Sequence, residues 1–155
     1  MTNKILIVAE HDGTKLNLST AKCVTCARAI PAAEITIAVF ANDATVVAQQ
    51  AAAIAGVAHV LRIDHAAHAH ALAANIAPQA AALAAGYAYV FGPSTTFGKD
   101  LMPRIAALLD TPQLSDVMAV ESATRFRRPI YAGNAIVTAE IPAGTKLVAT
   151  IRTAS

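Results

Sequence analysis

The sequence predicts an α/β fold in which a doubly wound, mainly parallel sheet carries added antiparallel strands at its C-terminal end. Up to Asp110, short runs rich in β-branched residues alternate with longer segments of helical periodicity. After Asp110, short extended runs follow one another and are separated by glycine and proline turns. Alternating strands and helices favour a parallel sheet covered by helices, whereas successive strands favour antiparallel pairing. A length of 155 residues fits a single domain that spans residues 1–155.

Each strand expected in the first part is a short apolar run bounded by turn residues. In chain order these strands are Ile5–Ala9, Glu34–Phe40, Val57–Ile63 and Tyr87–Phe91. The helices expected between and after them are Asn17–Ile30, a segment that ends near Gly56, an alanine-rich segment between His68 and Ala85, and Gly98–Leu109. Asn42 and Asp43 are good N-caps for the second helix, and Pro78 is expected to kink or divide the third.

The second part contains strand patterns without helical periodicity. The expected strands are Ser115–Glu121, Phe126–Tyr131, Ala135–Ala139 and Lys146–Ile151. Gly133-Asn134 and Pro142-Ala-Gly144 supply the turns between the last three.

Composition and charge exclude several classes of protein. No uninterrupted apolar run approaches the roughly 20 residues that span a bilayer. Because the chain enters a strand almost at once, we expect no signal or transit peptide, no membrane insertion and a cytoplasmic location. Two cysteines are too few for a disulfide scaffold and suit a reducing compartment.

A nucleic-acid partner is not expected either. The net charge is +2, and only 14% of the residues are charged. The short basic cluster of Arg125, Arg127 and Arg128 has only Phe126 as an interleaved aromatic residue. A solvated strand edge or a partner contact explains this cluster better than an RNA site.

The segment from Gly92 to Lys99 is rich in hydroxyl groups and joins an expected strand to an expected helix. In a Rossmann-like sheet, such a turn is where nucleotide phosphates bind. A Walker A loop has four residues between its glycines and a Ser or Thr after its lysine, whereas here five residues precede Gly98 and Asp100 follows the lysine. A P-loop NTPase is therefore disfavoured.

The residues that we interpret as a vestigial nucleotide-type turn are Thr95, Thr96, Gly98 and Lys99. Two roles stay open for them. The hydroxyl groups can cap the helix N-terminus while the lysine stays at the surface, or the turn can make a weak nucleotide contact.

Two further patterns suggest redox or metal chemistry. Cys23 and Cys26 have the spacing of a redox dithiol or half a zinc site, but they fall on the apolar stripe of a helix, well inside it, which favours buried structural cysteines. His65, His68 and His70 could ligate a metal, but a solvated helix N-terminus is the favoured reading and no metal is expected. No Ser/His/Asp order, paired-carboxylate motif or GxGxxG occurs, so no catalytic residue is proposed.

Several longer stretches resemble a known family in order and spacing. They are Ile5–His11, Thr95–Ala107, Ser115–Val117, Arg128–Ala135 and Thr150–Thr153. Together they resemble the N-terminal domain of the electron transfer flavoprotein α subunit, and the resemblance covers essentially the whole chain. The most specific blocks are Thr-Thr-Phe-Gly-Lys and Arg-Pro-Ile-Tyr-Ala-Gly-Asn.

The resemblance implies a Rossmann-like, adenine-nucleotide α-hydrolase-like fold and a role in electron transport. The family is a heterodimeric carrier, not an enzyme. Its α and β subunits hold one FAD, accept electrons from dehydrogenases such as acyl-CoA dehydrogenases, and pass them to a quinone oxidoreductase. FAD binds in the C-terminal α domain, which the resemblance implies is absent here, so no cofactor is expected in this chain. Alone, the chain is expected to be inert.

The partners implied are the β subunit and the chain's own flavin domain. Arg128, Tyr131 and Asn134 lie in a polar, glycine-flanked segment and are candidate contact residues; alternatively, Arg128 and Asn134 only close a tight turn. Two other functions stay open, namely a stand-alone adenine-nucleotide-binding module and a metal- or thiol-based redox protein.

Overall fold

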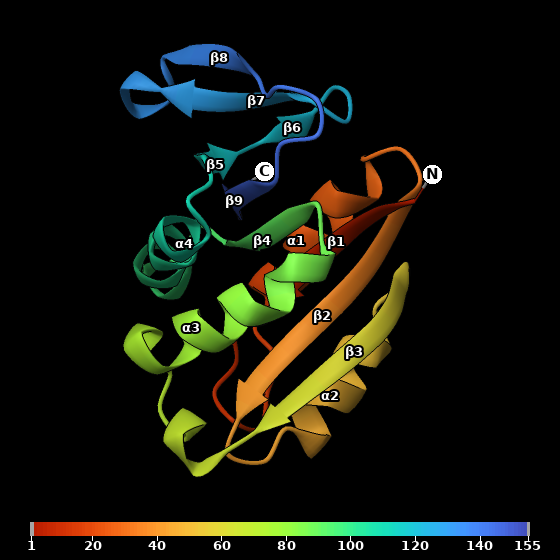
Figure 1. Ribbon diagram of the computed structural model, residues 1–155, viewed down its shortest axis with the longest axis vertical. Helices are drawn as coiled ribbons and strands as arrows, with labels where there is room; N and C mark the ends of the chain where they lie inside the picture. Colours follow the sequence, from red (N-terminus) through yellow and green to blue (C-terminus); the bar gives the residue numbers. More distant parts are fainter. Residues whose placement is uncertain (1, 155) are drawn as a thin grey trace.

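The computed structural model describes residues 2–154, and within them the chain forms two sheets (Figure 1). The larger sheet has six strands in the order β3-β2-β1-β4-β9-β5, and every neighbouring pair is parallel. The smaller sheet, β6-β7-β8, is antiparallel. The strands are β1 (Asn3–Val8), β2 (Ala33–Ala41), β3 (Val57–Asp64), β4 (Tyr89–Pro93), β5 (Gln113–Val117), β6 (Ala119–Val120), β7 (Arg125–Ile130), β8 (Ala135–Glu140) and β9 (Leu147–Ile151). The predicted fold class is confirmed.

Helices cover both faces of the larger sheet. They are α1 (Leu18–Arg28), α2 (Thr45–Ala52), α3 (Ala73–Leu83) and α4 (Thr96–Leu109), with short 3-10 turns η1 (Ala66–His68), η2 (Ala84–Gly86) and η3 (Tyr131–Gly133). Because successive side chains of a strand point to opposite faces, β1 contributes to two cores. Ile5 and Ile7 pack with residues of α1 and α2, whereas Leu6 and Val8 pack with residues of α3 and α4. Both faces of the sheet are therefore buried.

The last strand, β9, belongs to the parallel sheet, whereas the sequence predicted it among the antiparallel strands added at the C-terminal end. The strands β6, β7 and β8 are antiparallel as predicted, but β9 lies between β4 and β5 and is parallel to both. All 5 of its residues are buried, as in a strand covered on both faces. The run expected over Ser115–Glu121 is divided into β5 and β6, because Asp116 adopts a positive φ of 60° and the chain then leaves the larger sheet.

Pro78 does not divide the alanine-rich helix. It lies inside α3, which continues to Leu83. Pro78 and Ala74 are both exposed, so water can reach the Ala74 carbonyl for which Pro78 supplies no N–H. No helix within residues 2–154 is long and apolar enough to cross a membrane.

The antiparallel sheet extends beyond the larger sheet at one end of the molecule (Figure 1). Polar bonds and one apolar anchor attach it there. The Tyr89 hydroxyl donates to the Ala123 carbonyl at 2.6 Å, and the Phe126 side chain is fully buried against the core. Arg128 donates from Nε to the Ser115 carbonyl at 2.7 Å and from Nη2 to Ser115 Oγ at 2.9 Å. These attachments fix the β7–β8 hairpin relative to β4 and β5.

The start of α4 lies very close to the end of β4. A Cβ added to Gly98 would lie 1.6 Å from the Pro93 carbonyl oxygen, which is far inside contact distance. A Cβ added to Gly92 would lie 2.5 Å from Met102 Sδ. Glycine at these two positions lets α4 pack directly on the end of β4.

Gly98→Ala is expected to lower the free energy of unfolding by about 3 kcal/mol or more, because the new methyl group meets backbone that cannot rotate away. Gly86→Ala is the matched control, since nothing lies within 4 Å of its added Cβ. We expect that change to stay within about 1 kcal/mol of wild type. Urea unfolding of the three proteins measures the difference, and equal losses in both variants would contradict the close approach.

Candidate functional site at the carboxyl edge of the parallel sheet

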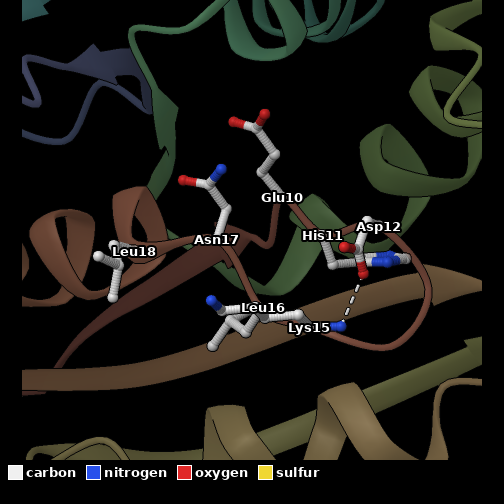
Figure 2. Close-up of a pocket in the computed structure, with 7 residues that line it drawn as sticks. All are labelled: Glu10, His11, Asp12, Lys15, Leu16, Asn17 and Leu18. Carbon is white, nitrogen blue, oxygen red and sulfur yellow. Dashed lines mark hydrogen bonds between the residues drawn. The ribbon is translucent and has the colours of Figure 1, made fainter.

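The carboxyl edge of the larger sheet contains a topological switch point between β1 and β4. The strand β1 has β2 on one side and β4 on the other, so the loops that follow β1 and β4 leave the sheet beside each other. Open parallel sheets bind ligands at this position. A cavity of about 400 Å³ lies at the loop after β1 and is lined by Glu10, His11, Asp12, Lys15, Leu16, Asn17 and Leu18 (Figure 2).

Glu10 is the charged group at the centre of this switch point. Thr95 Oγ1 donates a hydrogen bond to Glu10 Oε1 at 2.7 Å, and Ser19 Oγ lies 3.4 Å from the same oxygen. Thr95 is the N-cap of α4. Ser19 lies in the first turn of α1, and its backbone N–H donates to the side chain of Asn17, the N-cap of that helix. The carboxylate thus lies between two helix N-termini, whose positive ends favour a negative charge. Figure 2 shows the Glu10 and Asn17 side chains pointing away from Asp12 and Lys15.

The residues of the nucleotide-type turn lie together at the start of α4, in distinct roles. Thr95 Oγ1 accepts from the Gly98 N–H at 3.3 Å, which is an N-cap bond. Gly98 packs against β4, whereas Thr96 and Lys99 are exposed. The Ser94 hydroxyl oxygen is buried and has no hydrogen-bond partner among residues 2–154. The turn therefore caps the helix; a weak nucleotide contact stays a prediction.

Internal hydrogen bonds fix the loop after β1. Gly13 N–H donates to His11 Nδ1 at 2.9 Å, so the ring proton is assigned to Nε2, which donates to the Phe40 carbonyl at 2.8 Å. Asp12 accepts from the N–H groups of Thr14 and Lys15. The hydrogen bond from the Thr14 N–H is the main reason that the pKa of Asp12 is lowered. This loop also forms one wall of a second cavity, of about 490 Å³, opposite Asp43 and His70.

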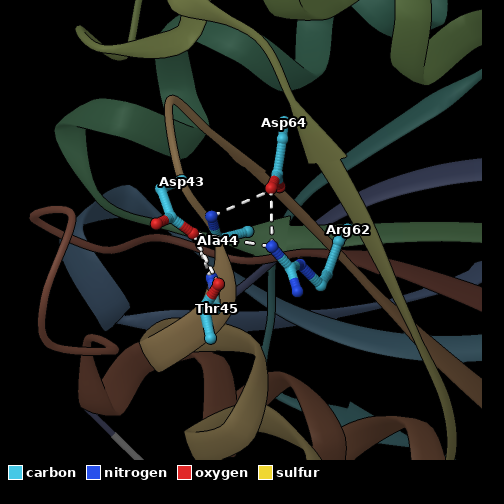
Figure 3. A network of polar contacts seen from close by, with 5 residues as sticks. All are labelled: Asp43, Ala44, Thr45, Arg62 and Asp64. Carbon is cyan, nitrogen blue, oxygen red and sulfur yellow. Dashed lines mark hydrogen bonds and ion pairs between the residues drawn. The ribbon is translucent and has the colours of Figure 1, made fainter.

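A polar network joins the ends of β2 and β3 (Figure 3). Arg62 Nη2 donates to Asp64 Oδ2 at 2.6 Å, and Asp64 Oδ1 accepts from the Ala44 N–H at 3.2 Å. Asp43 accepts from both the hydroxyl and the N–H of Thr45, and the hydroxyl bond chiefly lowers the pKa of Asp43. The predicted N-caps were wrong, because Ala44 and neither Asn42 nor Asp43 occupies the N-cap position of α2, although Asp43 still bonds Thr45 in the first turn. These groups are largely exposed and add little stability.

The histidine cluster is only partly solvated, so the sequence interpretation was wrong for His68. This side chain is 3% exposed; its ring contacts Phe40 edge-on, and Nε2 lies 3.0 Å from Gln79 Oε1. His65 and His70 are exposed. No group of three or more His, Cys, Asp or Glu side chains within residues 2–154 is placed to hold a metal ion.

The cysteines lie inside α1, as predicted, at different depths. Cys23 is fully buried and Cys26 is partly buried, because the buried stripe passes through Ala27. Burial raises the pKa of Cys26 to about 11 and also raises the pKa of Cys23. Neither thiol is activated in the way that a redox dithiol requires.

The candidate contact residues lie on the β7–β8 hairpin. Arg128 neither projects freely nor closes the turn, because its guanidinium bonds to Ser115 of β5. Tyr131 is 78% exposed at the tip, and Asn134 is exposed beside it.

Sequence reasoning missed Glu10 as a site residue. The signal that could have identified it is an acidic residue directly after the first parallel strand.

The fold and this edge define a doubly wound α/β domain with a topological switch point at the carboxyl edge of its parallel sheet. Residues 5–155 match the family described as the electron transfer flavoprotein domain. The chain belongs to this family, which confirms the resemblance.

Curated relatives agree with this assignment. The chain is 44% identical, over 96% of its length, to the electron transfer flavoprotein subunit alpha of Pseudomonas aeruginosa, and covers 48% of that protein. It is 43% identical over 97% of its length to the Paracoccus denitrificans subunit alpha, of which it covers 48%. It is 36% identical over 96% of its length to the mitochondrial subunit alpha of Dictyostelium discoideum, of which it covers 43%. The chain thus spans about half the length of these relatives.

The raised pKa of Cys26 predicts a loss of stability at alkaline pH. In the unfolded chain the thiol ionises near 9.0, and in the folded chain near 11. The stabilisation is therefore complete below pH 9 and is lost as pH rises towards 11, by roughly 2 kcal/mol. Urea unfolding from pH 8 to pH 11 should show a steeper decline for wild type than for Cys26→Ala. Identical slopes, or rapid labelling of both native thiols at pH 8, would contradict the buried assignment.

Proposed function

We propose that this chain is the N-terminal scaffold domain of an electron transfer flavoprotein α subunit. In the complete heterodimer, the flavin domain rests on it and the β subunit packs against it. The assembled protein carries electrons through FAD from dehydrogenases, such as acyl-CoA dehydrogenases, to a quinone oxidoreductase. The family match over residues 5–155 is the observation that carries the proposal. The chain itself acts as a carrier-subunit fragment and not as an enzyme.

The proposal assigns FAD to the flavin domain of the full-length protein. The residues of this chain do not fit the flavin pyrophosphate, because the two cavities at the carboxyl edge are lined by three carboxylates, those of Glu10, Asp12 and Asp43, against the single lysine Lys15. A phosphate site has N–H groups and cations in these positions. The flavin supplies the redox chemistry when bound in its own domain, and this chain supplies a rigid support. The proposal includes a cytoplasmic location, which the two free thiols support.

The tip of the β7–β8 hairpin is the contact surface that we assign to assembly. Tyr131 and Ala132 adopt positive φ angles of 52° and 55°, followed by Gly133 at 90°. Non-glycine residues in this region are strained, and such strain is concentrated where structure serves a function. Here the strained backbone presents an exposed tyrosine, and tyrosine is a common anchor of protein interfaces. Asn134 lies beside it and adds polar groups.

Tyr131→Ala in the full-length α subunit is expected to weaken association with the β subunit about tenfold or more, because it removes an anchor side chain. Its own domain should keep its stability, since Tyr131 is mostly exposed. Leu108→Ala, which truncates an exposed apolar side chain on α4, is the matched control and should leave association unchanged. Titration of one subunit into the other measures the affinities.

Arg128→Ala should also weaken assembly, because the β7–β8 hairpin loses its hydrogen bonds to Ser115. For the same reason it should lower the unfolding temperature of the domain. If association is unchanged in both Tyr131→Ala and Arg128→Ala, the hairpin is not the contact surface.

A further inference from the structure

The Glu10 carboxylate is held in place by its own backbone as well as by its side-chain contacts. The Glu10 N–H donates to Thr20 Oγ1 at 3.3 Å, and its carbonyl accepts from the Asn17 N–H at 2.9 Å. Both partners belong to the start of α1 or to the residue that caps it. With its main chain fixed in this way, Glu10 directs its carboxylate towards Thr95 at the start of α4. The position of the negative charge is thus built into the fold.

The groups around this carboxylate are those that otherwise bind phosphate. Thr95 Oγ1 links the carboxylate to a helix N–H, since it donates to Glu10 and accepts from Gly98. The Ser19 hydroxyl approaches the same carboxylate oxygen from α1. Ser94 precedes Thr95 in the chain, and its hydroxyl oxygen is buried without a partner within the described residues. Hydroxyl and N–H donors at helix N-termini, placed at the switch point of a parallel sheet, make a favourable position for an anion.

We propose that Glu10 is an internal substitute for a bound phosphate group. Its carboxylate occupies the anion position between α1 and α4, which holds the two helices together and excludes nucleotides from the switch point. A second anion placed there would meet a like charge at close range in a partly buried site. This role is independent of subunit assembly, so it goes beyond the scaffold function.

Removal of the carboxylate should therefore convert the switch point into a phosphate-binding site. Glu10→Ala removes the charge and leaves space, whereas Glu10→Gln keeps the size and removes only the charge. Thermal unfolding is measured in 20 mM sodium phosphate and in sodium chloride of equal ionic strength. We expect phosphate to raise the midpoint of Glu10→Ala by about 3 °C or more, that of Glu10→Gln by less, and that of wild type by less than about 1 °C.

A charge-matched control separates the site from the overall charge of the protein. Glu121→Ala removes one carboxylate on the β6–β7 side of the molecule and changes the net charge equally. It should behave as wild type does in phosphate. Adenosine monophosphate at the same concentration distinguishes recognition of the phosphate group from recognition of the base. A shift in Glu10→Ala at least as large as that with inorganic phosphate supports a site that accepts the phosphate group of a nucleotide.

Two results would overturn the proposal. One is an equal response to phosphate in wild type and in both Glu10 variants. The other is a Glu10→Ala protein with a native circular dichroism spectrum and no response to either ligand. If Glu10→Ala does not fold, Glu10→Gln decides the matter, because a neutral group of the same size should still admit phosphate to a measurable extent.

Discussion

The contact between Gly98 and the Pro93 carbonyl is the constraint on which the arrangement of the molecule depends. Because no side chain separates them, α4 begins within three residues of the end of β4 and lies directly on the sheet. This placement buries Leu101, Met102 and Ile105 in the core between the sheet and the helices α3 and α4. It also brings Thr95 to the switch point, where its hydroxyl meets Glu10. Packing of the core and closure of the candidate site therefore follow from one close approach.

Local sequence patterns predict the elements of this fold well, but they do not predict which strands become neighbours. The four parallel strands of the first part and their helices could be recognised from hydrophobic periodicity. The place of β9 could not, because pairing between β4, β9 and β5 is decided by contacts between residues far apart in the chain. A strand over Lys146–Ile151 was predicted among the added antiparallel strands, but an apolar run gives no information about which strands it pairs with.

The candidate site was less predictable than the fold, and the reasons are physical. The turn from Thr95 to Lys99 was visible as a glycine-bounded hydroxyl segment, but its anionic partner lies 85 residues away in sequence. His68 was misjudged because the ring that packs against it, Phe40, comes from β2, far from His68 in the sequence. Arg128 was interpreted as a contact residue or as closing a turn because its bond to Ser115, 13 residues earlier in the chain, could not be foreseen. In each case the deciding contact is tertiary, and no local pattern encodes it.

The position of β9 has a consequence for synthesis of the chain. While the ribosome is still making residues before 147, β4 has an open edge on one side and β5 has no neighbour in the larger sheet. An unpaired, apolar strand edge of this kind can join another chain. The antiparallel sheet β6-β7-β8 is made during this interval, and its bonds to Tyr89 of β4 and Ser115 of β5 do not depend on β9. The larger sheet therefore closes only when its last strand in the sequence pairs with both β4 and β5.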